Sequence, residues 1–423
     1  MSEARLVRIR PAVQHYEWGG AEFLPALLGA ANPERKPFAE LWYGAHPKAP
    51  SVAETARGDA RLDALIAEDP SFWLGETVAA RFGAALPFLL KVLDARKMLS
   101  IQVHPAREQA REGFERENAM GIPVHAPHRN YRDGNHKPEV HAAQSEFWML
   151  HGFRPLEEIA AWLERTPEAR GLMPDFRARL LEAGADRQRR GALLRELYTH
   201  VMHLPQERAD ELLDGLLERL ERASPWPSET HEHWALRAAR EFPLPGGRRD
   251  RGLFSIFLLN LVRLEPGQGT WQPAGVLHAY LKGATVELMA NSDNVLRGGL
   301  TPKHVDVAEL LRVVRFEDGP CAVLGGETLP DGERVWRTPV EDFELSCFAL
   351  SGAALRRETQ GPEILLAMEG EAMVSAAGCR LELRRGGAVF VRAGVRYELA
   401  SARAARVWRA KTALAGGSGR EIR

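Results

Sequence analysis

The sequence contains few cysteines and has almost no net charge. Its three cysteines, Cys321, Cys347 and Cys379, are widely spaced and form no CxxC pair, so neither a disulfide framework nor a zinc-finger pattern is indicated. The formal net charge is −1 over 423 residues, which lacks the basic excess typical of nucleic-acid-binding proteins. A small anionic ligand needs only a local basic pocket, and the net charge does not exclude one.

Long apolar runs are also absent. No stretch reaches the roughly 18 apolar residues of a transmembrane helix, and the N-terminal segment MSEARLVRIRPAV lacks the apolar core of a signal peptide. We therefore expect a cytoplasmic protein with no membrane partner. The chain is 45% hydrophobic and 27% charged, the composition of a globular protein. Its length predicts two or three structural units.

The most informative stretch is 267–303, GQGTWQPAGVLHAYLKGATVELMANSDNVLRGGLTPK. Pro273 restricts the backbone and Gly275 permits a tight bend, so that His278 begins the strand that follows. The pattern GxxxxxPxGxxH resembles the second signature of cupins, which are double-sheet antiparallel barrels. A polar run, NSDN at 291–294, comes after this strand. Such runs are usually turns, but this one follows a candidate metal ligand closely.

Two further segments place polar side chains on one face of a strand. In MLSIQVHP, residues 98–105, the side chains of Ser100, Gln102 and His104 alternate, and strand side chains repeat every two residues. Burying three such groups without partners is unfavourable, so this face is either solvated or part of a site. In HKPEVH, Pro138 keeps Lys137 extended, which puts Lys137 and Glu139 on one face.

The remaining pattern predicts alternating helical and β-rich regions. Helices are expected over 53–84 and, as a short helix, within 106–135, and strands begin at 86 and at 98. Apolar residues at helical spacing predict about four helices between 155 and 224. The almost unbroken apolar run 252–262 predicts a buried strand, and 305–320 a closing helix.

A second copy of the frame at 267–278 lies near the C-terminus. Gly386 is followed after five residues by RAGVRY, with Arg392 in place of the proline and Tyr397 in place of the histidine. We expect a second, degenerate barrel that keeps the turn but holds no metal, with Tyr397 in a structural role. The predicted fold is therefore mainly β with a helical insertion: two cupin (jelly-roll) barrels plus an all-α domain. The boundaries are 1–154 and 241–325 for the catalytic barrel with its closing helix, 155–240 for the helical domain and 326–423 for the degenerate barrel.

The candidate metal ligands are Gln102, His104, Glu139 and His278. Two imidazoles, one carboxylate and one amide oxygen leave room for water or substrate, as in an open catalytic site. This donor set fits zinc and also ferrous iron. The residues alone therefore leave open a ferrous cupin oxygenase, and also a sugar-binding cupin without enzymatic activity.

The sequence resembles type I mannose-6-phosphate isomerases over most of its length up to Lys303. The resemblance rests on four segments: ELWYGAHP, LPFLLKVLDARKMLSIQVHP, NYRDGNHKPEV and HAYLKGATVELMANSDNVLRGGLTPK. It implies a cupin enzyme of mannose metabolism that interconverts mannose 6-phosphate and fructose 6-phosphate and serves GDP-mannose biosynthesis. It also implies one Zn²⁺ per chain on the four candidate ligands, and an essential arginine at Arg297. Isomerisation of another phosphosugar or of free mannose is the nearest alternative.

The implied chemistry assigns roles to further residues. A proton moves between C1 and C2 through an enediol-like intermediate, whose developing negative charge a metal and a fixed guanidinium stabilise. Arg297 stays protonated and cannot be the base. The candidates for the base are Lys137, Glu287, His136 and Asp293. Those for phosphate binding are Ser100, Lys137 and Lys303, with Lys91 less favoured. We expect a monomer, although no sequence feature bears directly on assembly.

Overall fold

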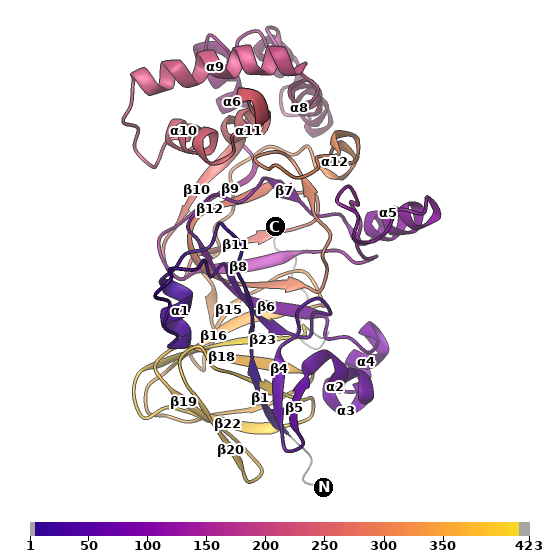
Figure 1. The fold of residues 1–423 in the computed structure, drawn as a ribbon, viewed down its shortest axis with the longest axis vertical. Helices are drawn as coiled ribbons and strands as arrows, with labels where there is room; N and C mark the ends of the chain where they lie inside the picture. The colour runs from indigo at the N-terminus through magenta and orange to yellow at the C-terminus, as the bar shows by residue number, and fades with distance from the viewer. Residues whose placement is uncertain (1–4, 414–423) are drawn as a thin grey trace.

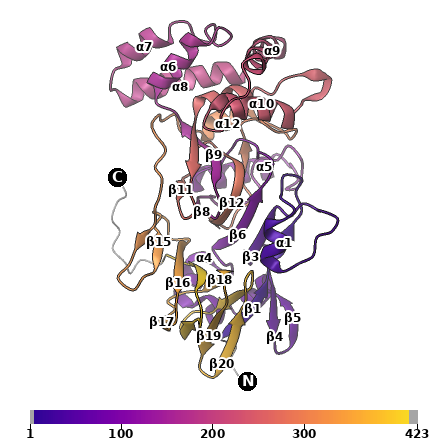
Figure 2. The ribbon, with the colours of Figure 1, turned by 90° about the vertical axis from the view of Figure 1, so that its left-hand side faces the viewer.

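The structure is a computed structural model that describes residues 5–413, and β-sheet dominates it (Figure 1). Within these residues, three sheets of nine, ten and four strands are accompanied by twelve α-helices. Helices α6 to α11 gather at one end of the molecule and the four-stranded sheet lies at the other (Figures 1 and 2). The predicted mainly β architecture with added helices is confirmed.

The ten-stranded sheet is built around its longest strand, β12 (His278–Ala290), which pairs with β6, β7, β8 and β9 along its length. The predicted strand after residue 86 is β6 (Phe88–Ala95), whereas the one expected from 98 is confined to β7 (Gln102–Val103). The other strands are β2 (Ala12–Gln14), β3 (Glu40–Gly44), β8 (Glu139–Ala143), β9 (Phe147–Phe153), β10 (Leu259–Leu264), β11 (Gly269–Gln272) and β13 (Leu296–Arg297).

The nine-stranded sheet combines the two ends of the chain. Strand β1 (Leu6–Arg10) pairs antiparallel with β21 (Ala388–Val391) on one side and with β4 (Val52–Thr55) on the other. The sequence-based boundaries, which separate 1–154 from 326–423, do not anticipate this pairing. The sheet also contains β5 (Gly58–Arg61), β14 (Glu327–Thr328), β15 (Arg334–Trp336), β16 (Glu344–Leu350), β18 (Glu363–Glu369) and β23 (Ala405–Lys411). The four-stranded sheet comprises β17 (Leu355–Glu358), β19 (Ala372–Ala376), β20 (Cys379–Leu383) and β22 (Arg396–Ala400).

A continuous hydrophobic core joins the two large sheets. Leu90 and Leu288 of the ten-stranded sheet belong to the same buried cluster as Leu366 and Trp408 of the nine-stranded sheet. Burial of apolar area is the main favourable contribution to folding. The sheets that carry the N-terminal and C-terminal parts of the chain are therefore expected to depend on each other for stability.

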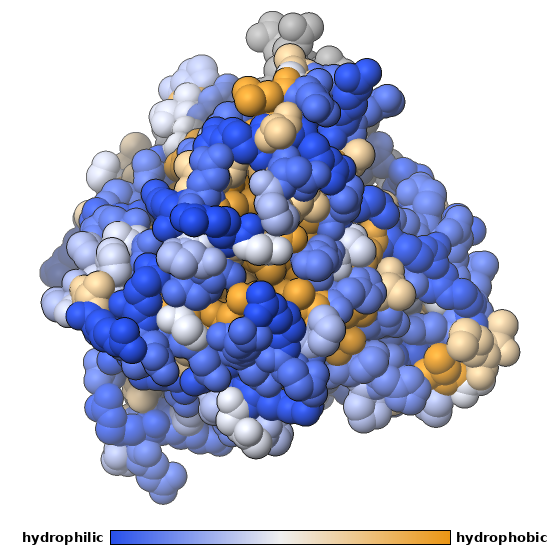
Figure 3. Space-filling model, turned by 90° about the horizontal axis from the view of Figure 1, so that it is seen from above, coloured by the Kyte–Doolittle hydropathy of each residue, from blue (hydrophilic) through white to orange (hydrophobic). Residues whose placement is uncertain are grey.

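The helical end contains the four helices expected between 155 and 224: α6 (Leu156–Arg165), α7 (Phe176–Ala183), α8 (Arg187–Met202) and α9 (Gln206–Arg222). Helix α10 (His231–Glu241) follows the proline-rich segment, and a 3₁₀ turn, η1 (Pro245–Gly247), comes next. Seen from this end, the surface is mostly hydrophilic, with apolar residues showing near its middle (Figure 3). No helix between residues 5 and 413 combines the length and hydropathy that a membrane span requires.

The predicted strand at 252–262 is wrong in its first part. Gly252–Leu258 forms helix α11, and only Leu259–Leu264 is a strand, β10. A short, continuous apolar run suits a buried helix as well as a buried strand. The helix is selected by its partners, because Phe257 stacks on Trp162 of α6 at 5.0 Å between ring centroids.

The helix expected over 53–84 begins later than predicted. Strands β4 and β5 form a hairpin first, with Gly58 at φ 104° where a residue with a side chain would be strained. Three short helices follow: α2 (Leu62–Glu68), α3 (Pro70–Leu74) and α4 (Glu76–Phe82). The remaining helices are α1 (Phe23–Leu28), α5 (Arg107–Ala119) and α12 (Val307–Val313), the last shorter than the predicted 305–320.

The repeated sequence frame adopts the same local structure twice. Strand β11, a turn and β12 correspond to β21, a turn and β22, with His278 and Tyr397 near the start of the second strand in each case. Gly275 has φ 84° and Gly394 has φ 70°. Both turns therefore need a residue that tolerates a left-handed backbone, which explains why glycine recurs at this spacing.

Candidate metal centre

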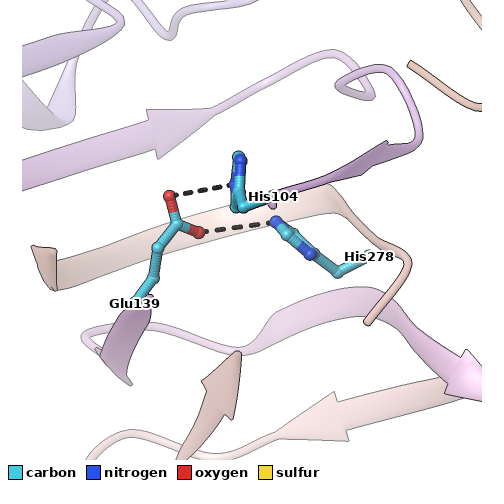
Figure 4. Close-up of side chains that lie close together, drawn as sticks. All are labelled: His104, Glu139 and His278. Carbon is cyan, nitrogen blue, oxygen red and sulfur yellow. Dashed lines mark ion pairs between the residues drawn. The ribbon is translucent and has the colours of Figure 1, made fainter. Parts of the chain in front are cut away.

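Three of the predicted ligands converge inside the ten-stranded sheet. His104, Glu139 and His278 are buried, and their potential ligand atoms all lie within 4.8 Å of one another. The Glu139 carboxylate faces both rings, with one oxygen 3.4 Å from His104 Nε2 and the other 3.4 Å from His278 Nε2 (Figure 4). Within residues 5–413, no other group of three or more His, Cys, Asp or Glu side chains has this arrangement.

The far side of each imidazole is fixed by a backbone carbonyl. His104 Nδ1 lies 2.7 Å from the carbonyl oxygen of Asn294, and His278 Nδ1 lies 3.0 Å from that of Val276. A carbonyl can only accept, so Nδ1 carries the proton and the Nε2 lone pair faces Glu139. Both Nε2 atoms are buried without a hydrogen bond to a described residue, an arrangement that a metal ion would satisfy.

The charge state of the site also suits a metal. Burial and the nearby Lys137 lower the pKa of His104 to about 4, so this imidazole is neutral near pH 7. Burial alone would raise the pKa of Glu139, but Lys137 and His104 outweigh it and hold that pKa well below its usual range. A neutral imidazole and an ionised carboxylate are the forms that bind metals.

The strand register aligns the fourth predicted ligand with the triad. Gln102 of β7 is directly opposite His278 of β12 and directly opposite Arg297 of β13. Residues that face each other across antiparallel strands project to the same side of the sheet. The register therefore brings Gln102, His278 and Arg297 to one face. This placement was predictable for Gln102 from its spacing to His104, but not for Arg297.

A buried pair of oppositely charged residues lies in the same sheet. Lys91 Nζ is 3.2 Å from Glu287 Oε1, and the Tyr280 hydroxyl donates to Glu287 Oε2 at 2.7 Å. Burial raises the pKa of Glu287, and Glu139 raises it further. Lys137 Nζ, in contrast, contacts the candidate ligand Glu139 Oε1 at 3.0 Å. The structure thus separates two of the predicted catalytic residues: Lys137 touches the triad, whereas both oxygens of Glu287 are engaged elsewhere.

Cationic side chains cluster near Arg297. Burial lowers the pKa of Lys303, and Arg297, Lys48 and Arg132 lower it further by their charge. None of these four residues forms an ion pair with any residue of the described part of the chain, so their charges repel one another without internal compensation. Sequence reasoning selected Arg297 and Lys303 and missed Lys48 and Arg132, which look like ordinary surface charges until the fold brings them together. Ser100 is half-buried on the segment before β7 and makes no hydrogen bond through its hydroxyl among residues 5–413.

The other two candidates for the base have different surroundings. Asp293 Oδ1 faces His46 Nε2 at 3.7 Å. His136 Nε2 lies 3.0 Å from the carboxylate of Asp342, which also accepts a hydrogen bond from Arg107 at 3.1 Å. Asp342 lies between β15 and β16, so the C-terminal part of the chain reaches a segment next to the triad. No local sequence signal marks Asp342, because its relevance depends on a contact 206 residues away.

These features define a class of protein: a predominantly β protein with one buried candidate metal site, which Lys137 contacts, and a cluster of cationic side chains near Arg297. Comparisons with known proteins narrow this class. Residues 6–156 match the family model described as phosphomannose isomerase type I, catalytic domain. The chain is 40% identical over 385 residues to the mannose-6-phosphate isomerase of Escherichia coli, covering 90% of this chain and 93% of the relative. It is 32% identical over 421 residues to mannose-6-phosphate isomerase 1 of Arabidopsis thaliana, covering 96% and 94%.

Solved structures agree with these relatives. The Salmonella typhimurium mannose 6-phosphate isomerase bound to fructose 6-phosphate and zinc superposes with a TM-score of 0.86 at 35% identity, covering 97% of this chain and all of that one. The chain belongs to the type I mannose-6-phosphate isomerase family. The resemblance drawn from the four sequence segments is thereby confirmed.

Proposed function

We propose that the protein is a zinc-dependent isomerase that interconverts D-mannose 6-phosphate and D-fructose 6-phosphate. The observation that carries this proposal is the pair of buried Nε2 lone pairs that face one ionised carboxylate beside an uncompensated cationic cluster. The lone pairs and the carboxylate suit a metal ion, and the cationic cluster suits a phosphorylated anion. The relatives with this name span nearly the whole chain. The oxygenase alternative has no use for the cationic cluster.

The spacing of the triad fits zinc. Tetrahedral zinc with bonds of about 2.0–2.2 Å separates neighbouring ligand atoms by roughly 3.3–3.6 Å. Each histidine Nε2 lies 3.4 Å from an oxygen of Glu139. His104, Glu139 and His278 would hold one zinc ion per chain, with Gln102 as the fourth protein ligand. When bound, zinc supplies a Lewis acid that polarises the substrate oxygens at C1 and C2.

Arg297 would stabilise the negative charge that develops on oxygen as a C–H bond of the substrate is broken. It is aligned with Gln102 and His278 and makes no ion pair within residues 5–413, so its charge is available to the substrate. The backbone N–H of Gly298 donates to the carbonyl oxygen of Ile101 at 2.8 Å, and the N–H of Ile101 donates to the carbonyl oxygen of Gly299 at 3.1 Å. These bonds anchor the backbone that follows Arg297. A fixed cation needs little reorganisation during the reaction, which is the basis of electrostatic preorganisation.

Proton transfer between C1 and C2 is assigned to Lys137, with Glu287 in a supporting role. The Lys137 side-chain nitrogen contacts the candidate zinc ligand Glu139 and would accept the proton as the neutral amine, whereas Glu287 is held by Lys91 and Tyr280. His136 and Asp293 remain alternative bases. Isomerisation in D₂O distinguishes them, because loss of the base should suppress deuterium incorporation at C1 and C2 while substrate binding persists. We expect this in Lys137→Met, and in Glu287→Gln only a smaller loss of rate.

Phosphate binding is assigned to Lys303 and Ser100, with Lys48 and Arg132 as additional cations. These three cations and Arg297 have no ion-pair partner among the described residues, so together they favour a dianionic group. Hydrogen bonds between charged groups are also stronger than those between neutral groups. Free mannose lacks the group that would use this cluster. A phosphorylated hexose is therefore the better substrate for this site.

We also propose a two-barrel fold, a cytoplasmic location and a metabolic role for this enzyme. The two large sheets and the four-stranded sheet would form two adjoining cupin (jelly-roll) barrels. The helical domain at 155–240 would be an insertion in the first barrel, and β1, β4 and β5 would complete the second. The repeated turns at Gly275 and Gly394 support this layout. The enzyme would act as a cytoplasmic monomer in mannose metabolism and supply mannose 6-phosphate for GDP-mannose synthesis.

A coupled assay with mannose 6-phosphate tests the function directly. The purified protein should isomerise this substrate, lose the activity when its metal is chelated, and regain it with stoichiometric zinc. His104→Asn and His278→Asn should lose both zinc and activity. His200→Asn, which changes an exposed histidine on α8, should retain both. Full turnover by a preparation shown to contain no metal would disprove the zinc-dependent mechanism.

A further inference from the structure

The buried side chain of Asn294 closes the polar run at 291–294 and uses its whole hydrogen-bonding capacity. Its exposed fraction is 0%. Its Oδ1 accepts from the backbone N–H groups of Arg132 at 2.7 Å and Asp133 at 3.3 Å. Its Nδ2 donates to the carbonyl oxygens of Asp133 and Asn135, both at 2.8 Å. A buried amide with every position used holds one orientation.

The backbone of the same residue touches a candidate ligand. The Asn294 carbonyl oxygen accepts from His104 Nδ1 at 2.7 Å, and this contact leaves the lone pair of His104 on Nε2, facing Glu139. His278 receives the corresponding contact from Val276, only two residues away in the same turn. His104 depends on a carbonyl 190 residues away in the sequence. Its orientation therefore requires that tertiary structure hold the Asn294 backbone in place.

The loop at 130–135 supplies that support. Besides its contacts with the Asn294 amide, Asp133 accepts hydrogen bonds from the Ser292 hydroxyl and the Asp293 N–H, both at 2.8 Å. Asn135 Nδ2 donates to the carbonyl of Asn291 at 3.1 Å. The loop continues directly into the segment that carries Glu139. One set of hydrogen bonds thus ties the loop before one ligand to the carbonyl that orients another.

We propose that Asn294 is a positioning residue for the metal centre, which fixes the tautomer and direction of His104 and couples them to the loop at 130–135. This inference rests on the proposed zinc site. Partners of this kind, beyond the ligands themselves, typically change metal affinity by about tenfold to a hundredfold when they are altered. The role explains why Ser292 and Asn294 of the polar run are buried where a solvated turn would be the ordinary expectation.

The decisive variant is Asn294→Asp, which keeps the size of the side chain but removes both N–H donors. The new carboxylate would face the Asp133 carboxylate and two carbonyl oxygens, so the loop and the Asn294 backbone should separate. Zinc affinity, measured by competition between the metal-free protein and a chromogenic chelator, should fall by about tenfold to a hundredfold. In ¹⁵N-histidine spectra of the metal-free protein, the His104 signals should shift toward a mixture of tautomers.

Asn291→Asp is the matched control. It makes the same chemical change in the same run, at a side chain whose Nδ2 donates to Leu86 O. The backbone carbonyl of Asn291 accepts from Asn135 Nδ2 and, unlike that of Asn294, contacts no candidate metal ligand. It should retain zinc affinity within about threefold. Equal zinc affinities in Asn294→Asp and wild type, or an equal loss in both variants, would refute the positioning role.

Two further measurements keep the test decisive. If Asn294→Asp fails to fold, Asp133→Asn replaces it, since this change weakens the same loop contacts without adding charge, and it should lower zinc affinity several-fold. Unchanged affinity in a folded Asp133→Asn protein would also refute the proposal. Zinc binding to the wild-type protein is measured first. If wild-type protein binds no zinc, the metal centre itself is wrong, and this result is distinct from a failure of the Asn294 inference.

Discussion

Replacing Arg297 with alanine is the most direct test of how the site stabilises its transition state. The guanidinium of Arg297 is half-buried. Burial lowers its pKa, and the positive charge of Arg132 lowers it further. Arginine nevertheless remains protonated at neutral pH. Arg297 makes no ion pair with any of residues 5–413. It lies on the same face of the sheet as Gln102 and His278. A negative charge that forms on the substrate would be its nearest counter-charge.

The expected effect follows from this geometry. Two unit charges about 4 Å apart interact by about 4 kcal/mol at the effective dielectric constant of partly buried sites. An interaction of this size, made only in the transition state, corresponds to a loss of about a thousandfold in kcat. Arg297→Lys keeps the charge but not the planar fork, and it should fall between wild type and alanine.

Steady-state kinetics with mannose 6-phosphate, with zinc content measured alongside, decides the role. Arg297→Ala should lower kcat by about a hundredfold to a thousandfold with little change in KM and with zinc retained. Arg263→Ala on β10, an arginine outside the site that pairs with Glu146, is the control and should stay within twofold of wild type. A raised KM with an unchanged kcat would refute the catalytic assignment and make Arg297 a substrate-binding group.

Other changes test other parts of the structure. Lys303→Met should raise KM for mannose 6-phosphate by about tenfold while kcat changes little, because a phosphate contact persists in ground and transition states alike; kinetics that show the reverse would contradict this. Lys91→Met leaves the Glu287 carboxylate buried without its cation and should lower the free energy of unfolding by about 3–5 kcal/mol, measured by urea denaturation of the zinc-bound protein. Tyr397→Phe removes the hydrogen bond to Glu363 and should cost about 1–3 kcal/mol of stability, yet leave kcat within a few-fold and zinc stoichiometry unchanged; loss of zinc would contradict its structural role.

The candidate ligands were predictable one by one because local rules mark them, whereas their convergence depends on the pairing of β7 and β8 with the distant β12. The period of two along a strand puts Gln102 and His104 on one face, and the Pro–Gly turn starts a strand at His278. Each signal lies within about ten residues of the side chain that it places. The sequence also predicted the repeated turn around Gly394, since a left-handed backbone position favours glycine.

The features that the sequence did not predict depend on contacts between distant segments. The pairing of β1 with β21 joins residues more than 370 apart, and no local pattern encodes the partner of a strand. Helix α11 has an apolar run that suits either secondary structure until Trp162 packs against it. Lys48 and Arg132 have nothing in their immediate sequence that distinguishes them from solvated charges. Their role arises only from the position of Arg297 and Lys303 in the folded chain.

The two copies of the repeated frame differ in how their buried carboxylates are neutralised. Near the first, Glu139 contacts the Lys137 ammonium group at 3.0 Å and faces two imidazole lone pairs that make no hydrogen bond to a described residue, an arrangement that a metal ion would satisfy. In the second, Tyr397 donates to Glu363 at 2.9 Å, and Arg409 lies 3.5 Å from Glu363 and 2.5 Å from the buried Glu333. A guanidinium that the chain itself supplies thus neutralises the carboxylates near the second copy. A buried charge is stable only when it is paired. Glu363 and Glu333 near the second copy are already paired with Arg409. A tyrosine at position 397, where the first copy has His278, is therefore compatible with a stable core, because Arg409 and Tyr397 together satisfy the nearby carboxylates.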